Sequence, residues 1–395
     1  MRLHKRLADY RVWFADSGGE PYIDSIEGHR RTGRWYKASD AYYQARMQGL
    51  QARTLVAAAA NNAHLYAPGA PYHRLRLIVG NGDYTAQGQA AVAGSRRLGD
   101  YGQVVQYNLP SNDYIVQDFD AKSIGSGDYY PTVYRVSVFA GGSNPAELGD
   151  LRLYAYADLT PLLRDLTPVR TSYEVSAFAP LGESALLGRY LQGRAYQVSL
   201  LVARSDESLP WLLSLREGDE VELEYDGVYL PCSVQSAESR PAGGALWEIE
   251  YQLVATAAYG YSPLRYVVVH NHSGQGDLHG YEMPGNAPAP VELRLQVTQT
   301  HASDIDIHLP ASGEVVRIRP DATGIWSLHD TGRIYHIPTG TQAQWIDRTD
   351  ILKQGALPIV LPSGDGVFAL AHSASWGLPQ VALAAYPRYM PEVSL

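Results

Sequence analysis

The chain of 395 residues contains little cysteine, little charge and no long apolar run. Its one cysteine, Cys232, excludes an intrachain disulfide and a metal site built from several cysteines, and we expect it to be a small buried hydrophobe. Charged residues make up 18% of the chain, which is below the usual share of about 25% and predicts a surface largely covered by partners. The longest apolar run, residues 55–60, falls far short of the ~20 residues of a membrane helix, so no membrane insertion is expected.

The first residues, MRLHKRLADYRVW, are basic but lack the apolar segment and cleavage site of a secretory signal, which predicts a product assembled inside the cell. The whole chain has a net charge of −9, whereas residues 1–60 hold ten Lys or Arg against six Asp or Glu. A basic arm on an acidic body predicts contact with an acidic neighbouring subunit, with nucleic acid as the alternative. The candidate interface residues are those where basic and aromatic side chains alternate: Arg30, Arg31, Arg34 and Trp35.

Aromatic residues are plentiful but uneven in kind, with 29 Tyr and 7 Trp against 5 Phe. Tyrosine combines an apolar ring with a polar tip, which suits half-buried strand faces and hydrated interfaces. High β-propensity alone is the other explanation. Both interpretations predict a β-rich protein with extensive contact surfaces.

The fold class predicted is all-β, with tandem β-sandwich domains and one N-terminal helix. Residues 1–68 are expected to form an arm with that helix over residues 41–60, where Ala, Gln, Arg and Leu dominate. Residues 69–168 are expected to form a β-sandwich, because stretches such as Arg74–Val79 and Tyr134–Phe139 alternate with a period of two.

A ring-forming β-sandwich is predicted over residues 169–265, a linker over residues 266–290 and a final sandwich over residues 291–395. In the first of these, residues 205–219 predict a short helix and Asp226-Gly227 a tight hairpin. The linker is assigned from its high content of Gly, Pro and His.

Three histidines in that linker, His270, His272 and His279, are the first candidates for chemistry. Histidines two residues apart on a strand point to the same face and can share a metal ion. Beyond Asp277, no carboxylate or cysteine nearby completes the ligand set. We therefore favour a surface loop rich in Gly and His.

A second candidate is the alternating set Asp304, Asp306 and His308, which could form a Ca²⁺ site or a carboxylate pair. The favoured alternative is the polar face of an amphipathic strand. Gly274-x-Gly276 lacks the third glycine and the helix of a dinucleotide fingerprint. The sequence also contains no nucleophile elbow, phosphate loop or His-Glu-x-x-His motif. We expect no catalytic residue, no metal and no cofactor.

Two stretches resemble the distal tail proteins of long-tailed bacteriophages. In residues 188–263, Gly-Arg-Tyr precedes a strand, a short helix, a hairpin and the segment Trp247–Pro263, as in that family's N-terminal ring-forming sandwich. In residues 285–387, the segment Gly285–Pro290, the strand VELRLQV and the proline-containing segment Leu357–Gly364 resemble the family's galectin-like C-terminal domain.

The resemblance implies a structural component of the phage tail, found in the virion and assembled in the host cytoplasm. Family members form a ring that joins the tail tube to the tip or baseplate, and the expected ring is a hexamer, with a trimer as the alternative. The implied partners are copies of the chain, the tail-tube protein and tail-tip or receptor-binding proteins. DNA would pass through the lumen without specific binding. Residues 1–168 have no counterpart at the start of that family and are expected to be an added part.

Two alternatives stay open. A tail-tube protein would form many stacked rings instead of one. A carbohydrate-binding module would use aromatic residues of the final sandwich to stack on sugar rings, and the candidates are Trp326, Trp345 and Trp376. The same tryptophans could instead pack in the core.

Overall fold

The structure is a computed structural model, and strands dominate the residues that it describes, which confirms the all-β prediction. No helix in this part of the chain is long and apolar enough to cross a membrane. The described residues are 1–11, 24–25, 34–38, 42–45, 62–68, 73–81, 88–95, 105–109, 114–124, 133–140, 148–170, 194–257, 259–274, 276–338 and 346–390.

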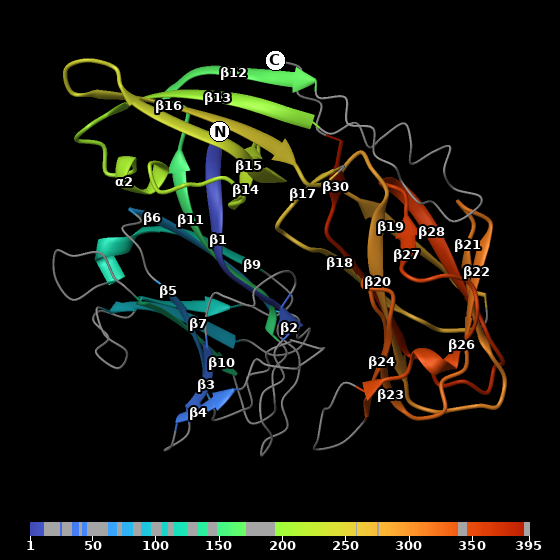
Figure 1. The fold of residues 1–395 in the computed structure, drawn as a ribbon. Coiled ribbons are helices and arrows are strands. Elements are labelled where there is room, and N and C mark those ends of the chain that lie inside the picture. The colour runs from blue at the N-terminus through green and yellow to red at the C-terminus, as the bar shows by residue number, and fades with distance from the viewer. Residues whose placement is uncertain are drawn as a thin grey trace.

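Four antiparallel sheets organise these strands (Figure 1). The largest, the central sheet, contains β1 (Arg2–Arg11), β2 (Asp24–Ser25), β6 (Arg74–Asn81), β9 (Tyr114–Asp120), β11 (Leu148–Asp158), β12 (Leu163–Arg170), β13 (Arg194–Ala203), β14 (Glu220–Tyr225), β15 (Val228–Pro241), β16 (Leu246–Ala255), β17 (Gly260–Tyr261) and β30 (Arg388–Tyr389). A second sheet contains β3 (Arg34–Ala38), β4 (Tyr42–Ala45), β5 (Asn62–Pro68), β7 (Gly88–Ser95), β8 (Val105–Leu109) and β10 (Val133–Ala140).

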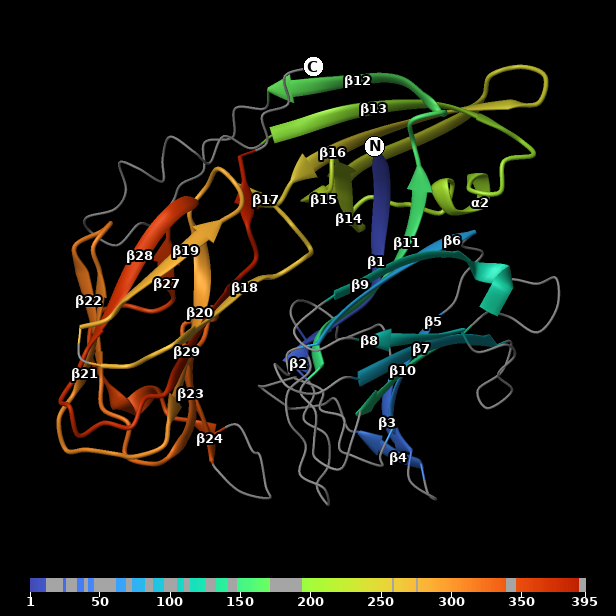
Figure 2. The same ribbon diagram turned by 180° about the vertical axis from the view of Figure 1, so that it is seen from behind.

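The other two sheets form the C-terminal sandwich, which lies beside the N-terminal layers in Figures 1 and 2. One contains β18 (Tyr266–Asn271), β20 (Ala289–Val297), β23 (Gly324–Leu328), β24 (Ile334–Pro338), β25 (Ile346–Asp347), β27 (Ile359–Leu361) and β29 (Gln380–Ala385). The other contains β19 (Leu278–Met283), β21 (Ile305–Leu309), β22 (Glu314–Ile318), β26 (Leu352–Gln354) and β28 (Gly364–Ala371). The described helical turns are η1 (Ala121–Ile124), α2 (Leu209–Leu212) and η2 (Thr349–Ile351).

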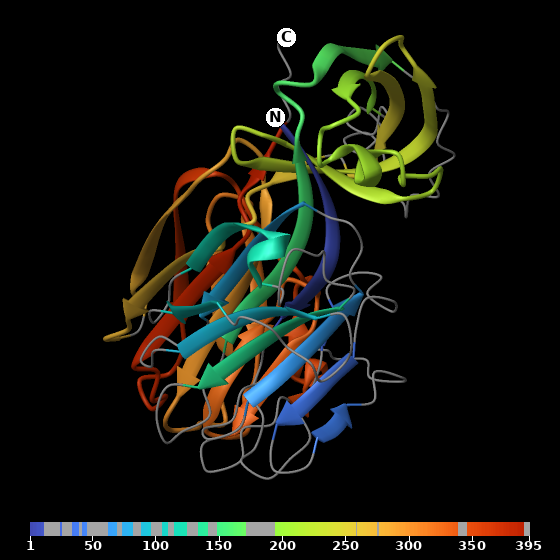
Figure 3. The ribbon, with the colours of Figure 1, turned by 90° about the vertical axis from the view of Figure 1, so that its left-hand side faces the viewer.

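Strand β1 holds the central sheet together, because it lies between β14 and β11 in the order β12-β13-β16-β15-β14-β1-β11-β6-β9. Leu3 is opposite Leu223 of β14 on one side and opposite Ala157 of β11 on the other. Figure 3 shows the later strands of this sheet, green to yellow, curling at one end of the molecule above the blue strands. One sheet therefore passes through the boundaries that the sequence suggested near residues 68 and 168.

The two faces of the central sheet differ in chemistry, since successive side chains on a strand point to opposite sides. Leu3, Leu77 and Leu153 enter one hydrophobic core, which also contains Leu209 and Trp211 of α2. The opposite face carries charged and aromatic side chains, among them His4, Arg76, Tyr154 and Glu224. Cys232 lies in the core as expected, and burial raises the pKa of its thiol to about 12.

The predicted final sandwich is present as two sheets around a core of its own, in which Trp326 and Phe368 are buried. It also includes β18 and β19, which precede the predicted start at residue 291. Its last strand, β30, returns to the central sheet and pairs with β17, which pairs with β15. Gly285 takes a φ of 110°, and a Cβ there would lie 2.3 Å from the carbonyl oxygen of Arg388. Only glycine allows the backbones to approach so closely at this point.

Two predictions of local structure are corrected. Part of the helix predicted over residues 41–60 is strand β4, in which adjacent tyrosines favour a β conformation and pairing with β3, and residues 46–60 lie outside the described residues. The linker predicted over residues 266–290 contains β18 and β19. Its three consecutive valines pair with β29, and Leu278–Met283 alternates between exposed and buried positions. The linker was predicted from the Gly and Pro content of the whole segment, which does not reveal strands as short as these.

Two other local predictions are confirmed. The hairpin between β14 and β15 turns at Asp226 and Gly227, whose φ angles of 51° and 75° match the left-handed pair of a type I′ turn. The helix expected within residues 205–219 is present as the single turn α2, with Pro210 in its first turn, where the missing N–H costs nothing.

Replacing Leu3 by alanine tests whether β1 stabilises the whole N-terminal part. Leu3 is fully buried, so Leu3→Ala is expected to lower the free energy of unfolding by about 3 kcal/mol in urea titrations followed by tryptophan fluorescence. The control is Leu278→Ala, since Leu278 is 68% exposed and its loss should have almost no effect. Equal stabilities of the two variants would contradict this role of β1.

Candidate functional site

The first candidate site is a polar network on the face of the central sheet opposite the hydrophobic core. It is largely buried and is centred on Arg76 of β6. Its guanidinium donates to both carboxylate oxygens of Asp118, at 2.6 and 2.8 Å, and to the hydroxyl of Tyr229 at 2.6 Å. It also contacts Glu224 of β14 at 3.2 Å, and Nε2 of the buried His4 donates to the same carboxylate at 2.6 Å. Strands β1, β6, β9, β14 and β15 are thereby joined through side chains as well as backbone.

Burial and ion pairing act against each other in this network. Burial alone would raise the pKa of Glu224, but the hydrogen bond from His4 and the charge of Arg76 lower it to about 2. Burial also lowers the pKa of His4, so His4 is a neutral donor to an ionised Glu224. The network satisfies buried charges and contains no arrangement of nucleophile and base.

The same face connects to the C-terminal sandwich through Tyr261 of β17. Its hydroxyl accepts a hydrogen bond from Arg6 at 2.8 Å and donates one to Glu222 at 2.9 Å. Arg152 donates to the carbonyl of Pro263 at 3.3 Å and lies over the ring of Tyr386, 4.8 Å from its centroid. The segments that enter and leave the C-terminal sandwich are thus held against the central sheet.

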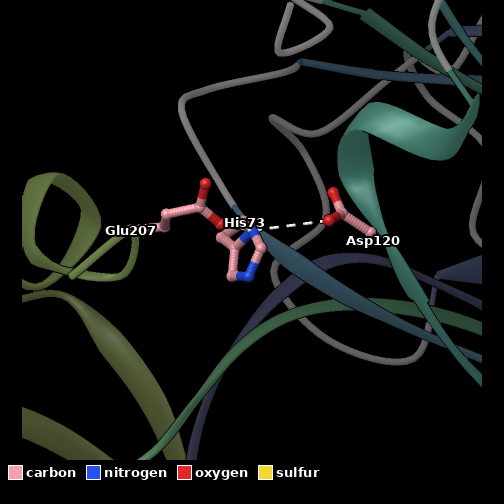
Figure 4. Close-up of side chains that lie close together, drawn as sticks. All are labelled: His73, Asp120 and Glu207. Carbon is pink, nitrogen blue, oxygen red and sulfur yellow. Dashed lines mark ion pairs between the residues drawn. The ribbon is translucent and has the colours of Figure 1, made fainter. Parts of the chain in front are cut away.

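A second candidate site is the cluster of His73, Asp120 and Glu207, drawn in Figure 4. His73 precedes β6, Asp120 ends β9 and Glu207 lies just before α2. Nδ1 of His73 is 2.7 Å from Oε2 of Glu207 and 3.7 Å from Oδ2 of Asp120. His73 and Glu207 also line a cavity of about 300 Å³. One imidazole and two carboxylates at such distances are a ligand set for a divalent cation.

A third candidate is a row of buried histidines in the C-terminal sandwich. Nε2 of His279 is 3.0 Å from Nδ1 of His272, and Nε2 of His272 is 2.6 Å from Nε2 of His372. Nδ1 of His372 donates to the carbonyl of Ser373 at 2.7 Å. That carbonyl fixes the other protons in turn, if each ring is neutral: His272 donates to His372, and His279 donates to His272.

Both ring nitrogens of His272 face another imidazole, so a proton added to His272 would place two N–H groups against each other. At the end of the row, burial and then the charge of the neighbouring His270 and His272 lower the pKa of His279 to about 4. Burial followed by the proximity of His372 also lowers the pKa of His272, against the opposing effect of Asp277. Burial lowers the pKa of His270 against the opposing effect of a backbone hydrogen bond at Gly280, and His270 lies beside His279 with ring centroids 5.1 Å apart.

The sequence predicted these histidines only in part. The favoured surface-loop interpretation is wrong for His272 and His279, which are buried because β18 and β19 belong to the sandwich. His372 was missed, since it follows β28 far along the chain, and so was the set of His73, Asp120 and Glu207. Only the strand pairing brings these residues together, and no local motif marks them.

The other predicted candidates are placed as follows. Asp304 forms an ion pair with Arg319, and Asp306 a two-point ion pair with Arg317, which lowers the pKa of Asp306; this is the polar face of an amphipathic strand. His308 lies on the same face of β21.

Of the candidate interface residues, Arg30 and Arg31 lie outside the described residues. Arg34 and Trp35 lie in β3, where they are opposite Tyr66 and Leu65 of β5. The structure therefore leaves the interface a prediction.

The candidate sugar-binding tryptophans do not form an exposed platform. Trp326 is buried, stacks on His336 with centroids 4.3 Å apart, and donates to the carbonyl of Ala322 at 3.0 Å. Trp376 is also buried and donates to Ser303 at 3.1 Å. Both pack in the core, so neither offers a ring face to a sugar, while Trp345 lies outside the described residues.

Comparisons with known proteins found weak structural similarity only. No family model matches the chain, and no curated protein matches it. Among solved structures, the Dit protein (gp 19.1) of SPP1, described as a paradigm of the hub adsorption apparatus in phages that infect Gram-positive bacteria, has a TM-score of 0.37 and 12% identity over 59% of this chain and 96% of that one.

Two further structures are similar over most of this chain. The PBSX exported protein XepA has a TM-score of 0.20 and 8% identity over 93% of this chain and 98% of that one. An M60 catalytic domain with two CBM51 domains from Clostridium perfringens ZmpB has a TM-score of 0.19 and 9% identity over 96% of this chain and 38% of that one. These TM-scores are too low to carry an argument about function.

The histidine row predicts a pH dependence of stability. A histidine with a lowered folded-state pKa binds its proton more readily when unfolded, so its stabilisation is present above pH 6.5 and is lost as the pH falls toward about 4. We expect the melting temperature to fall over this range, and His279→Gln to reduce the fall. His308→Gln, on the outer face of β21, should retain the full fall, and identical pH profiles of wild type and His279→Gln would refute the assignment.

Proposed function

We propose that the protein is a structural component of a phage tail, in the manner of a distal tail protein that forms a ring between the tail tube and the tip or baseplate. The observation that carries this proposal is the order of the elements. Strand β13, the helical turn α2, the hairpin β14–β15 and strand β16 follow one another, and a two-sheet sandwich comes next. This is the order that the sequence resemblance implies for the ring-forming sandwich and the galectin-like domain.

The physical character of the chain supports a role in assembly. A closed ring needs two different complementary faces on each subunit. The described central sheet ends in β12 at one side and β9 at the other, and these ends are different surfaces far apart in the sheet order. Low charge and abundant tyrosine suit interfaces that become buried on assembly. We propose a hexamer, with a trimer as the alternative, and no catalytic activity.

The remaining partners follow from this role. The ring-forming sandwich would contact the tail-tube protein, and the C-terminal sandwich would dock tail-tip or receptor-binding proteins. Residues 1–168, which have no counterpart at the start of the family, would move together with the ring because β1 lies inside its sheet. DNA would pass through the lumen without specific binding, in a virion assembled in the host cytoplasm.

The alternatives differ in what supports them. A tail-tube protein would share the sandwich but occur in many stacked rings per particle. A carbohydrate-binding role has lost two of its three candidate residues, because Trp326 and Trp376 are buried. No observation favours it over a docking role.

Self-association is the direct test of the ring. Sedimentation of the purified chain at micromolar concentration should show species near six or three times the 43.4 kDa subunit, and electron microscopy should show rings. Arg34→Glu in the predicted interface should shift the distribution toward monomer, whereas the control Arg333→Glu, at an ion pair with Asp347 in the C-terminal sandwich, should not. A chain that stays monomeric both alone and with a tail-tube protein would contradict the proposal.

A further inference from the structure

We propose that His73, Asp120 and Glu207 bind a divalent cation of the zinc class. The three residues come from three separate segments, and one ligand atom from each lies within 4.8 Å of the others. Ligand atoms around a tetrahedral zinc are about 3.3 Å apart, given bonds of about 2.0 Å. The observed separations of 2.7 and 3.7 Å from Nδ1 of His73 lie on either side of this value, so small side-chain rotations would complete the site.

The state of His73 is the second observation that points to a metal. Its Nδ1 is shielded from solvent and makes no hydrogen bond of acceptable geometry, although the Glu207 carboxylate is 2.7 Å away. A buried ring nitrogen without a hydrogen bond is costly, and a cation between the nitrogen and the carboxylates would satisfy it. This distinguishes the cluster from an ordinary surface group of acidic residues.

The ligand types select the kind of cation. One imidazole nitrogen and two carboxylates suit Zn²⁺ and similar transition metals, whereas Mg²⁺ and Ca²⁺ prefer oxygen ligands alone. Three protein ligands leave a fourth position for water or another small ligand. The adjoining cavity of about 300 Å³, also lined by Tyr156 and Asp158, has room for it.

Lys122 on η1 supplies the competing positive charge. Its ammonium group lies 3.2 Å from Oε1 of Glu207, while its backbone N–H donates to Oδ1 of Asp120 at 2.8 Å. The backbone hydrogen bond orients Asp120 and leaves its other oxygen for the metal. The ammonium, in contrast, must move aside or share Glu207, so its removal should strengthen metal binding.

A cation at this site would link parts of the chain that are distant in sequence. His73 and Asp120 lie at neighbouring ends of the paired strands β6 and β9, whereas Glu207 belongs to the segment between β13 and α2. The metal would tie the segment before α2 to the outer strands of the central sheet. This inference does not depend on the proposed tail function.

Titration of the metal-free full-length protein with zinc chloride tests the site. Calorimetry should show binding with one cation per chain, and His73→Ala and Glu207→Gln should each weaken it at least about tenfold. Lys122→Met should strengthen binding severalfold. His279→Gln is the matched control for the buried histidine row and should bind zinc as the wild type does.

Two further measurements make the outcome decisive. Melting temperatures without metal establish that each variant is folded, and zinc should raise the melting temperature of the wild type but not of His73→Ala. Cobalt substitution should give the visible absorption of a low-coordinate site that includes histidine. Absence of saturable binding, binding unchanged in both ligand variants, or weaker binding in Lys122→Met would overturn the proposal.

Discussion

The structure depends on the pairing of β1 with two strands that come much later in the chain. Because β1 lies between β11 and β14, the central sheet is continuous from β12 to β9, and the hydrophobic core beneath it includes residues from both β1–β11 and β13–β16. Through Leu3, β1 contributes to this core at the point where the two groups of strands meet. The polar network around Arg76 reinforces the same strands from the opposite face, where buried charges are tolerated because each has a partner.

The sequence predicted the elements whose signal lies within a few consecutive residues. Arg74–Val79 alternates along β6 as expected, with leucines in the core and Arg76 on the opposite face, and Asp226-Gly227 turns the hairpin. Strand pairing was not predictable. The sequence of β1 is basic, and nothing in it indicates that this strand lies between β11 and β14. The helix expected over residues 41–60 failed at β4 because helix propensity is weak beside strand pairing.

The candidate sites were likewise predictable only where their residues are close together in the sequence. The short spacing of His270 and His272 drew notice, yet the contact of His272 with His372 depends on how the loop after β18 meets the end of β28. The set of His73, Asp120 and Glu207 needs β6 paired with β9 and the α2 segment packed beside them. For Trp326 and Trp376 the residue type suggested stacking on sugars, but the fold buries both rings in the core of the C-terminal sandwich.

The position of β1 also affects how the chain can be synthesised. Strand β1 leaves the ribosome well before its two neighbours, so one of its edges must wait for β11 (Leu148–Asp158) and the other for β14 (Glu220–Tyr225), which lies beyond the middle of the chain. During that time its Leu3 side chain and its backbone groups are exposed to other strands and to neighbouring nascent chains. We therefore expect the yield of correctly folded protein to depend on translation speed and on chaperones that shield open strands.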